Sequence, residues 1–143
     1  MSKCIMISGH RDISSTEFSE QYAHQLIDLV LKGYSFVVGD CNGVDYASQK
    51  LLETCGATDV TIYHMKDEPN FYVEGFTTIG GFKSDVDRDF AMTLTSDEDL
   101  AWVRKGKERS GTAQNIYRRG VKAQGVTDIK EIMTLEAGMF LYE

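Results

Sequence analysis

The tripeptide Ser110-Gly111-Thr112 lies directly before a run with the apolar spacing of a helix, and we expect that helix over Thr112–Lys122. A glycine beside a hydroxyl residue at a helix start leaves backbone N–H groups free, and the helix dipole adds partial positive charge there. Gly111 lets a ligand approach the backbone closely, and Thr112 offers a hydroxyl group that can also cap the helix. The loop therefore predicts a site for a small anion such as phosphate, with an ordinary helix cap as the alternative.

The charges of the chain favour a small anion over a long polyanion. The net charge is −7, from 15 basic and 22 acidic residues, and such a field repels a nucleic acid as a whole. Six basic residues and one acidic residue nevertheless lie between Arg104 and Arg119. We expect Arg109, within this cluster, to add charge to the anion site; solvated surface charges are the alternative interpretation.

A second group of candidate site residues follows the apolar run Ser35–Gly39. Gly39 and Gly43 flank a turn from strand to helix, and a carboxylate at the end of a second strand often binds ribose hydroxyl groups. Asp40 and Asp45 are the candidates for that role, and they are also the candidate catalytic carboxylates if the chain is an enzyme. The alternative for Asp45 is stabilisation of the first turn of the helix.

A third group, Gly9-His10-Arg11, follows the first apolar run. Arg11 is placed to contact a phosphate, whereas His10 needs an oriented partner before it can act as a base. His10, His24 and His64 lack the spacing of metal ligands. We therefore expect neither a metal nor a cofactor.

These groups have to be positioned by alternating strands and helices. Apolar runs predict short buried strands, and apolar residues spaced by three and four predict helices, the first of which starts with the capping box Ser14-x-x-Glu17. The predicted strands are Lys3–Gly9, Ser35–Gly39, Val60–Tyr63 and Asp99–Val103, with Ile129–Leu135 as a candidate for a last one. The predicted helices begin near Ser14, Val44, Ser84 and Thr112.

The alternation predicts the α/β class: one Rossmann-like domain over residues 1–143, with a mainly parallel sheet of about five strands and helices on both faces. In such sheets ligands bind beyond the carboxyl ends of the strands. The three groups described above all follow predicted strands, so we expect them to meet at one edge of the sheet.

The stretch 66–83 has no clear period, and a loop of that length is usually functional. Phe71 and Tyr72 within it are candidates to stack on a base, with coverage of the core as the alternative. We interpret five acidic residues as helix N-terminal and surface acids: Asp85, Asp87, Asp89, Asp97 and Asp99. We assign Met92, Trp102 and Tyr117 to the core rather than to a subunit interface.

Composition limits the class of protein. The 143 residues, 42% of them apolar, suit one globular domain. No apolar run reaches the roughly 18 residues of a membrane helix, and the first residues do not resemble a secretory signal. The three cysteines are an odd, widely spaced set, which suits a reducing compartment. We therefore expect a cytoplasmic location without membrane contact.

Two of the motifs resemble a known family. Ser110-Gly111-Thr112-Ala113 at a helix start, with Gly39-x-x-x-Gly43-x-Asp45 after the second strand, resembles the SLOG superfamily of Rossmann-like domains, which includes LOG (lysine-decarboxylase-like) and DNA-processing Smf proteins. The Ser-Gly-Thr-Ala stretch is also similar to nucleoside deoxyribosyltransferases. The resemblance spans roughly residues 4 to 119. It implies a nucleotide-type ligand, and it leaves room for a homodimer or a higher homo-oligomer.

The resemblance also concerns position 115. In the enzymatic members a glutamate three residues after the threonine serves cleavage of an N-glycosidic bond, and Asn115 stands there in this chain. An amide can act neither as a nucleophile nor as a base. Asn115 therefore argues against this activity, although it remains a candidate ligand contact.

We thus expect a domain that binds or senses a phosphorylated nucleotide or a nucleotide-derived small molecule. The first alternative is an N-glycosidic hydrolase or transferase acting on nucleosides or nucleoside monophosphates, with Asp40 or Asp45 as a relocated carboxylate. The second is a single-stranded DNA binder, against which the net charge argues.

Overall fold

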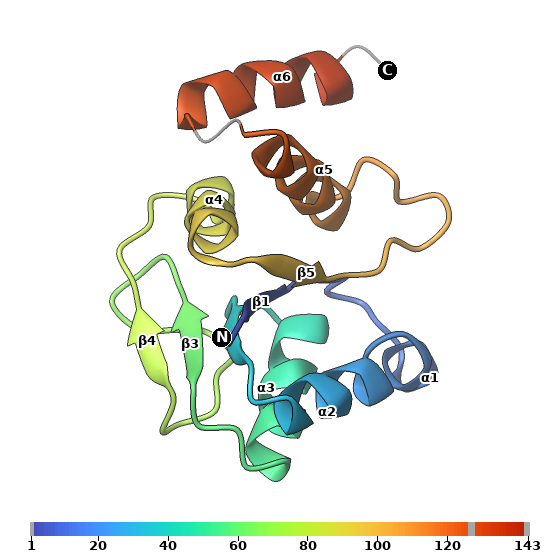
Figure 1. Cartoon of the computed structure of the whole chain (residues 1–143), viewed down its shortest axis with the longest axis vertical. Helices are drawn as coiled ribbons and strands as arrows, with labels where there is room; N and C mark the ends of the chain where they lie inside the picture. The colour runs from blue at the N-terminus through green and yellow to red at the C-terminus, as the bar shows by residue number, and fades with distance from the viewer. Residues whose placement is uncertain (1, 126–127, 142–143) are drawn as a thin grey trace.

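A computed structural model, which describes residues 2–125 and 128–141, contains one sheet between two layers of helices (Figure 1). The strands are β1 (Cys4–Ile7), β2 (Ser35–Val38), β3 (Val60–Tyr63), β4 (Thr77–Ile79) and β5 (Glu98–Leu100). The helices are α1 (Ser15–Phe18), the π-helical segment η1 (Ser19–Ala23), α2 (His24–Leu31), α3 (Val44–Thr54), α4 (Asp85–Thr95), α5 (Gly111–Ala123) and α6 (Ile129–Leu141).

The strand order is β4-β3-β2-β1-β5, and every neighbouring pair is parallel. The chain adds strands outward from β1 to β4 and then returns to pair β5 with the other side of β1. The strand order therefore reverses between β1 and β5, which is the position where open parallel sheets bind ligands. The predicted Rossmann-like α/β fold is confirmed, and the sheet is wholly parallel.

Alternate side chains of β1 belong to the two faces of the sheet, as the two-residue period of a strand requires. Ile5 and Ile7 pack with residues of η1, α2 and α3, whereas Met6 packs with Met92 of α4. Figure 1 shows α1, α2 and α3 on one face and α4 and α5 on the other. Helix α6 lies outside α5 as a further layer.

The strands differ from the expected ones in three places. Ile129–Leu135 is helical and belongs to α6, because its Ile132 is buried against Phe90 and Val121 on the outer side of α4 and α5, away from the sheet. The stretch 66–83 is not wholly irregular, since its residues Thr77–Ile79 form the edge strand β4. The expected strand Asp99–Val103 is shifted to Glu98–Leu100, and the Trp102 N–H beyond it donates to the Tyr22 hydroxyl instead.

Three expected helix starts have the geometry of side-chain caps. The Ser14 hydroxyl accepts the Glu17 N–H while the Glu17 carboxylate accepts the Ser14 N–H, which is a complete capping box. The Ser84 hydroxyl accepts the Asp87 N–H at the start of α4. At the start of α5 the cap is Ser110, whose hydroxyl accepts the Ala113 N–H, and not Thr112, so the helix begins at Gly111. These caps fix where α4 and α5 begin, and both helices begin at the carboxyl edge of the sheet.

Candidate functional site

A cavity of about 100 Å³ lies at the carboxyl end of β1, between α4 and the first turn of α5. We call it the switch-point cavity because it is next to the place where the strand order reverses. Its lining consists of Ile7, Ser8, Gly9 and Arg11 after β1, Cys41 and Asp45 after β2, Asp85, Arg88, Asp89 and Met92 of α4, and Thr112 of α5. The structure thus brings together parts of all three groups of candidate residues.

Three polar side chains in this lining are buried and incompletely paired. The Ser8 hydroxyl has no hydrogen-bond partner among the described residues. Thr112 is 5% exposed, and its hydroxyl makes no hydrogen bond within the described residues. The Asp45 carboxylate accepts one N–H, that of Cys41 at 3.1 Å, through a single oxygen. Buried polar groups are usually paired, so these three mark a place where a polar ligand would gain hydrogen bonds.

Burial changes the acidity of Asp45. Removal from water raises the pKa of this carboxyl to about 7, against the opposing effects of the Arg88 charge and the Cys41 N–H. Gly39 makes the burial sterically feasible, because a Cβ at that position would lie 2.6 Å from the Asp45 carboxylate. Asp45 can therefore exchange a proton near neutral pH inside the cavity.

Arg88 is the centre of the charge network beside the cavity, and the sequence analysis missed it. Its guanidinium is buried and lies 2.9 Å from Asp40, 3.1 Å from Asp89 and 3.3 Å from Asp85. The second oxygen of Asp40 accepts the Asn70 N–H at 2.9 Å. Both oxygens of Asp40 are thus used inside the protein, which leaves Asp45 as the better placed of the two candidate carboxylates.

The interpretation of Asp89 as a surface acid was wrong. Its carboxylate lines the cavity and is largely buried, with 14% of the side chain exposed. Burial raises its pKa, while Arg88 and the amide of Asn115 lower it. Asn115 does not line the cavity; its Nδ2 donates to Asp89 at 3.1 Å. The amide therefore acts on the cavity through Asp89 rather than by reaching into it.

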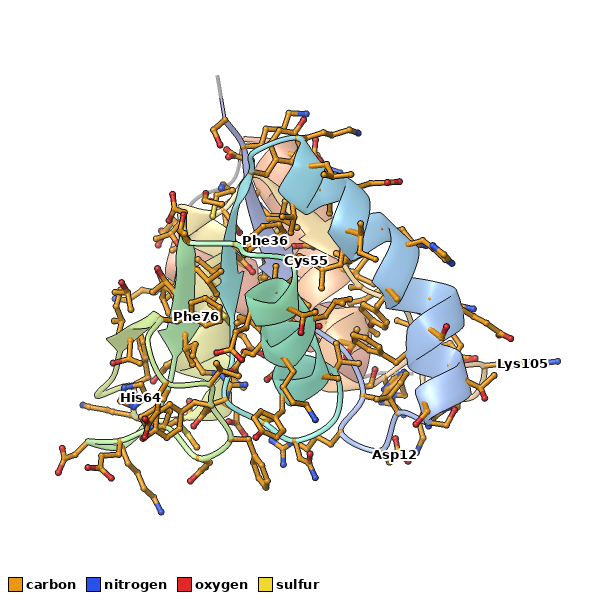
Figure 2. All side chains as sticks on the ribbon, turned by 90° about the horizontal axis from the view of Figure 1, so that it is seen from below. Asp12, Phe36, Cys55, His64, Phe76 and Lys105 are labelled. Atoms are coloured by element: carbon orange, nitrogen blue, oxygen red, sulfur yellow. The ribbon has the colours of Figure 1, made fainter. Side chains whose placement is uncertain are left out.

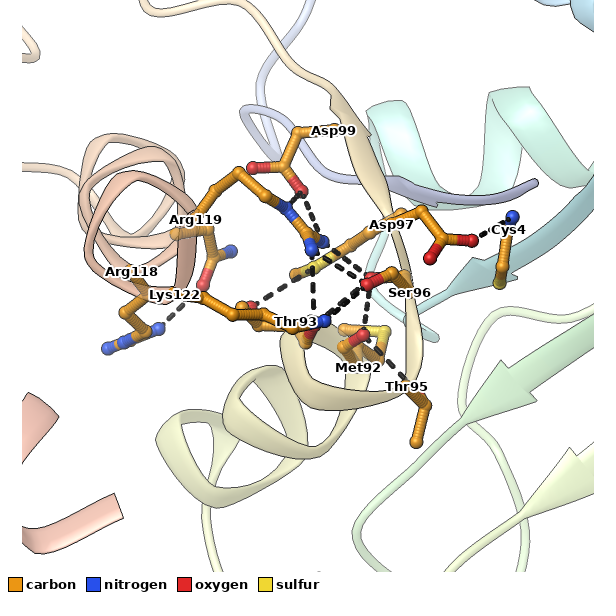
Figure 3. Close-up of polar contacts among 12 residues, drawn as sticks. Cys4, Met92, Thr93, Thr95, Ser96, Asp97, Asp99, Arg118, Arg119 and Lys122 are labelled. Atoms are coloured by element: carbon orange, nitrogen blue, oxygen red, sulfur yellow. Dashed lines mark hydrogen bonds and ion pairs between the residues drawn. The ribbon is translucent and has the colours of Figure 1, made fainter. Parts of the chain in front are cut away.

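Asp99 was also misassigned to the surface, because its side chain is only 10% exposed and pairs with Arg119 at 2.9 Å. Figure 3 shows Arg119 and Lys122 of α5 at the end of α4, where both donate to the carbonyl groups of Thr93 and Ser96. Cations at a helix C-terminus stabilise that helix. Arg119 therefore joins α5 to α4 instead of serving an anion site.

The cationic cluster between residues 104 and 119 is divided in the structure. Arg104 bridges Asp12 and Glu17, so it holds the loop before α5 against the first helix. Lys105 and Lys107 are exposed, and Figure 2 shows Lys105 extending away from the molecule. Arg109 is exposed beside the Ser110 cap. The two lysines of this cluster thus lie on the exposed loop, outside the cavity.

His10, Gly43 and the neighbouring backbone join the loops after β1 and β2. The His10 Nε2 accepts the Arg104 N–H at 2.9 Å, and its carbonyl accepts the Val44 N–H at 3.2 Å. Burial lowers the pKa of His10, which favours the neutral ring that this acceptor role requires. Gly43 has a φ of 79° and lies against the carbonyl groups of His10 and Arg11. His10 and Gly43 therefore position the site and do not line it. Gly9 does line the cavity, and a Cβ at that position would overlap the Val44 side chain.

A second hollow of about 220 Å³ adjoins the cavity and shares Arg11, Cys41, Asp85 and Arg88 with it. Its outer wall includes Phe71, whose ring is partly exposed and lies 5.9 Å from that of Tyr46. Tyr72 instead packs against the core. Of the two aromatic candidates, the structure therefore brings Phe71 to the site.

Comparison of the chain with family models, curated proteins and solved structures finds no match. Within residues 2–125 and 128–141, no three His, Cys, Asp or Glu side chains are grouped as metal ligands. No helix in the described part of the chain is both long enough and apolar enough to cross a membrane. The case for a function consequently depends on the site itself.

Proposed function

We propose that this chain binds a 5′-phosphorylated nucleoside or a similar phosphorylated pentose, with the sugar in the switch-point cavity. The observation that carries the proposal is the set of incompletely paired buried groups on Ser8, Asp45 and Thr112. For a fully buried group such as the Ser8 hydroxyl, the lack of a partner costs about 1–3 kcal/mol. Sugar hydroxyl groups both donate and accept, so a pentose can pair with all three at once.

The charges in and around the cavity favour different positions for the sugar and for the phosphate of the ligand. The cavity is lined by three carboxylates, on Asp45, Asp85 and Asp89, and by two guanidinium groups. A neutral, hydroxylated group suits this mixed lining, whereas a phosphate inside it would be repelled by the carboxylates. The phosphate belongs outside, at the start of α5.

The start of α5 suits the phosphate for local reasons. The Ser110 hydroxyl accepts the Ala113 N–H, and the first N–H groups of any helix lack partners within that helix. A Cβ built on Gly111 would meet nothing within 4 Å, so the backbone is accessible there. Thr112 links this helix end to the cavity, since it belongs to both. A phosphate at Gly111 and a sugar in the cavity are thus compatible with one ligand.

The adjoining hollow provides a place for the base. The cavity by itself is small, because pockets for cofactors and drug-sized ligands typically span about 300–1,000 Å³. The hollow extends the site from the shared residues Arg11 and Arg88 toward Phe71. Stacking of a base on an aromatic ring contributes about 1–3 kcal/mol. We expect adenosine 5′-monophosphate to bind more tightly than ribose 5-phosphate for this reason.

The test is a calorimetric titration of the protein with ribose 5-phosphate, adenosine 5′-monophosphate and unphosphorylated ribose. Gly111→Asp puts a carboxylate at the proposed phosphate position. Because charge-assisted hydrogen bonds contribute about 1.5–3 kcal/mol, the variant should bind both phosphorylated ligands at least about tenfold more weakly. An acidic residue in the first turn is favourable for a helix, so the variant should remain folded.

Gly120→Asp is the matched control, because Gly120 is also exposed on α5 with open space around it. It adds the same charge nine residues along the helix, about 13 Å away, which exceeds the Debye length of roughly 8 Å at physiological salt. Its affinities should equal those of the wild type. Equal affinity of Gly111→Asp and Gly120→Asp for ribose 5-phosphate, or no binding by the wild type, would overturn the proposal.

A further inference from the structure

A chain of polar contacts runs from the C-terminal helix α6 to the switch-point cavity. Glu136 of α6 accepts two hydrogen bonds from Arg118 of α5, at 2.7 and 2.5 Å. Arg118 donates to the Asn115 Oδ1 at 2.6 Å, and the Asn115 Nδ2 donates to Asp89 at 3.1 Å. Asp89 is the cavity carboxylate described above. Three helices thus contribute to one connected series.

Each member of this series fixes the orientation of the next. Arg118 only donates and a carboxylate only accepts, so the Asn115 amide must turn its oxygen to Arg118 and its NH₂ group to Asp89. Arg118 is itself held by the forked pair with Glu136 and by the Phe90 ring, 4.4 Å from its guanidinium carbon. A forked arginine–carboxylate pair is geometrically specific. One oxygen of Asp89, Oδ2, is therefore oriented through a residue of α6 that is distant from the cavity, whereas Arg88 donates to the other oxygen, Oδ1.

The burial of the series makes it sensitive to the loss of one member. Arg118 is 1% exposed and Glu136 has 12% of its side chain exposed. Water screens such buried charges poorly, so the removal of one charge changes the electrostatic energy of the remaining charged groups. Glu136 balances the charge of Arg118, and Arg118 in turn favours the ionised form of Asp89.

We infer that α6 is part of the ligand site: Glu136 and Arg118 are positioning residues that hold the cavity carboxylate Asp89 through the amide of Asn115. This inference rests on the proposed function where it concerns affinity, whereas the link to Asp89 stands independently of any ligand. It assigns to Asn115 the role of orienting a carboxylate supplied by α4.

The experiment follows the titration of the Asp89 side-chain carboxyl carbon by nuclear magnetic resonance in two variants. Glu136→Gln leaves the Arg118 charge unbalanced, so the pKa of Asp89 should fall. The double variant Arg118→Met with Glu136→Met removes that charge and frees the Asn115 amide, so the pKa of Asp89 should rise. Apolar replacement of a buried ion pair is often neutral for stability, so we expect the double variant to remain folded.

Glu131→Gln is the control, because Glu131 is exposed on the same helix, and it should leave Asp89 unchanged. Opposite shifts in the two test variants show that Arg118 and Glu136 are coupled to Asp89, whereas attachment of α6 without such coupling would leave the pKa of Asp89 unchanged. Shifts of the same sign, or none, would overturn the inference. In parallel, the double variant should bind ribose 5-phosphate about tenfold more weakly, as the loss of one hydrogen bond implies. If the wild type does not bind this ligand, the proposed function fails while the Asp89 titration still decides the inference.

Discussion

At the scale of single residues, the carboxylates of the site differ in their surroundings more than in their chemistry. Asp40 has both oxygens paired, with Arg88 and with the Asn70 backbone, and so belongs to the framework. Asp45 is equally buried but has one hydrogen bond, and its pKa is raised to about 7. The same residue type thus serves structure at one position and is available to a ligand at the other.

The raised pKa of Asp45 predicts a pH-dependent stability. Between its ordinary pKa of 3.8 and about 7, the unfolded chain loses the Asp45 proton while the folded chain keeps it. The folded state then binds more protons, so this residue lowers the free energy of unfolding as the pH rises. The Asp45→Asn variant cannot titrate at this position, so it does not undergo this decrease in the free energy of unfolding. From pH 4 to pH 8 its stability should therefore rise relative to that of the wild type, by about 1.4 kcal/mol for each unit of pKa shift.

Urea unfolding at both pH values measures this difference. Asp28→Asn, at an exposed position of α2, serves as the control and should show no such trend. A stability difference between Asp45→Asn and the wild type that does not change with pH would contradict the assignment of a raised pKa.

At the scale of elements, the site depends on how the first turn of α3 meets the loop after β1. Gly43 caps α3 with a φ of 79° and a ψ of −128°, and its Cα faces the carbonyl groups of His10 and Arg11. A side chain here would require both an unfavourable backbone conformation and displacement of that loop. The glycines of the Gly39–Asp45 turn are therefore explained by packing, whatever ligand binds.

Gly43→Ala should destabilise the protein by at least about 1–3 kcal/mol, because its Cβ would lie 2.4 Å from the His10 carbonyl oxygen. Gly111→Ala is the matched comparison, since it adds a methyl group at a helix start with open space around it. That variant should be neutral or more stable by about 0.4–1 kcal/mol. Equal unfolding midpoints in urea for the two variants would show that the Gly43 conformation is not required.

At the scale of the whole molecule, charge limits the partners. The net charge is −7, and two arginines of the only cation-rich stretch identified in the sequence, Arg118 and Arg119, are paired with Glu136 and Asp99. A long nucleic acid requires many phosphate contacts at once. The phosphate site that we propose at α5 is local, whereas the overall field of the chain opposes a polymer.

We expect no mobility shift of a single-stranded oligonucleotide by this protein, even at low ionic strength. Electrostatic binding to nucleic acids strengthens steeply as salt is lowered, so this condition is the most demanding for the expectation. Lys105 and Lys107 are the exposed lysines of the loop before α5. A shift that weakens with added salt and disappears in Lys105→Glu with Lys107→Glu would revive the DNA-binding alternative.

Much of the fold could be predicted from local patterns. Apolar runs of four or five residues identified β1, β2 and β3, and the Ser14–Glu17 spacing identified the first helix start, because these signals act between residues close in sequence. Short apolar runs do not distinguish a strand from a buried helix, which explains the error at Ile129–Leu135. Strand β4 was missed because Thr77–Ile79 is exposed and follows a long irregular stretch.

What the sequence by itself determined is the α/β class, the loops at the strand ends and the capped start of α5. Only the tertiary structure decided which carboxylates line the cavity. Arg88 meets Asp40 across 48 positions of sequence, and Asn115 meets Asp89 across 26. Such pairs form because a charged side chain that is buried when the helices pack is stable only with a polar or oppositely charged partner. That partner can come from a distant part of the sequence. Local sequence spacing does not determine which carboxylates line the cavity. Only the tertiary structure distinguishes Asp45 and Asp89 from the acids on the surface.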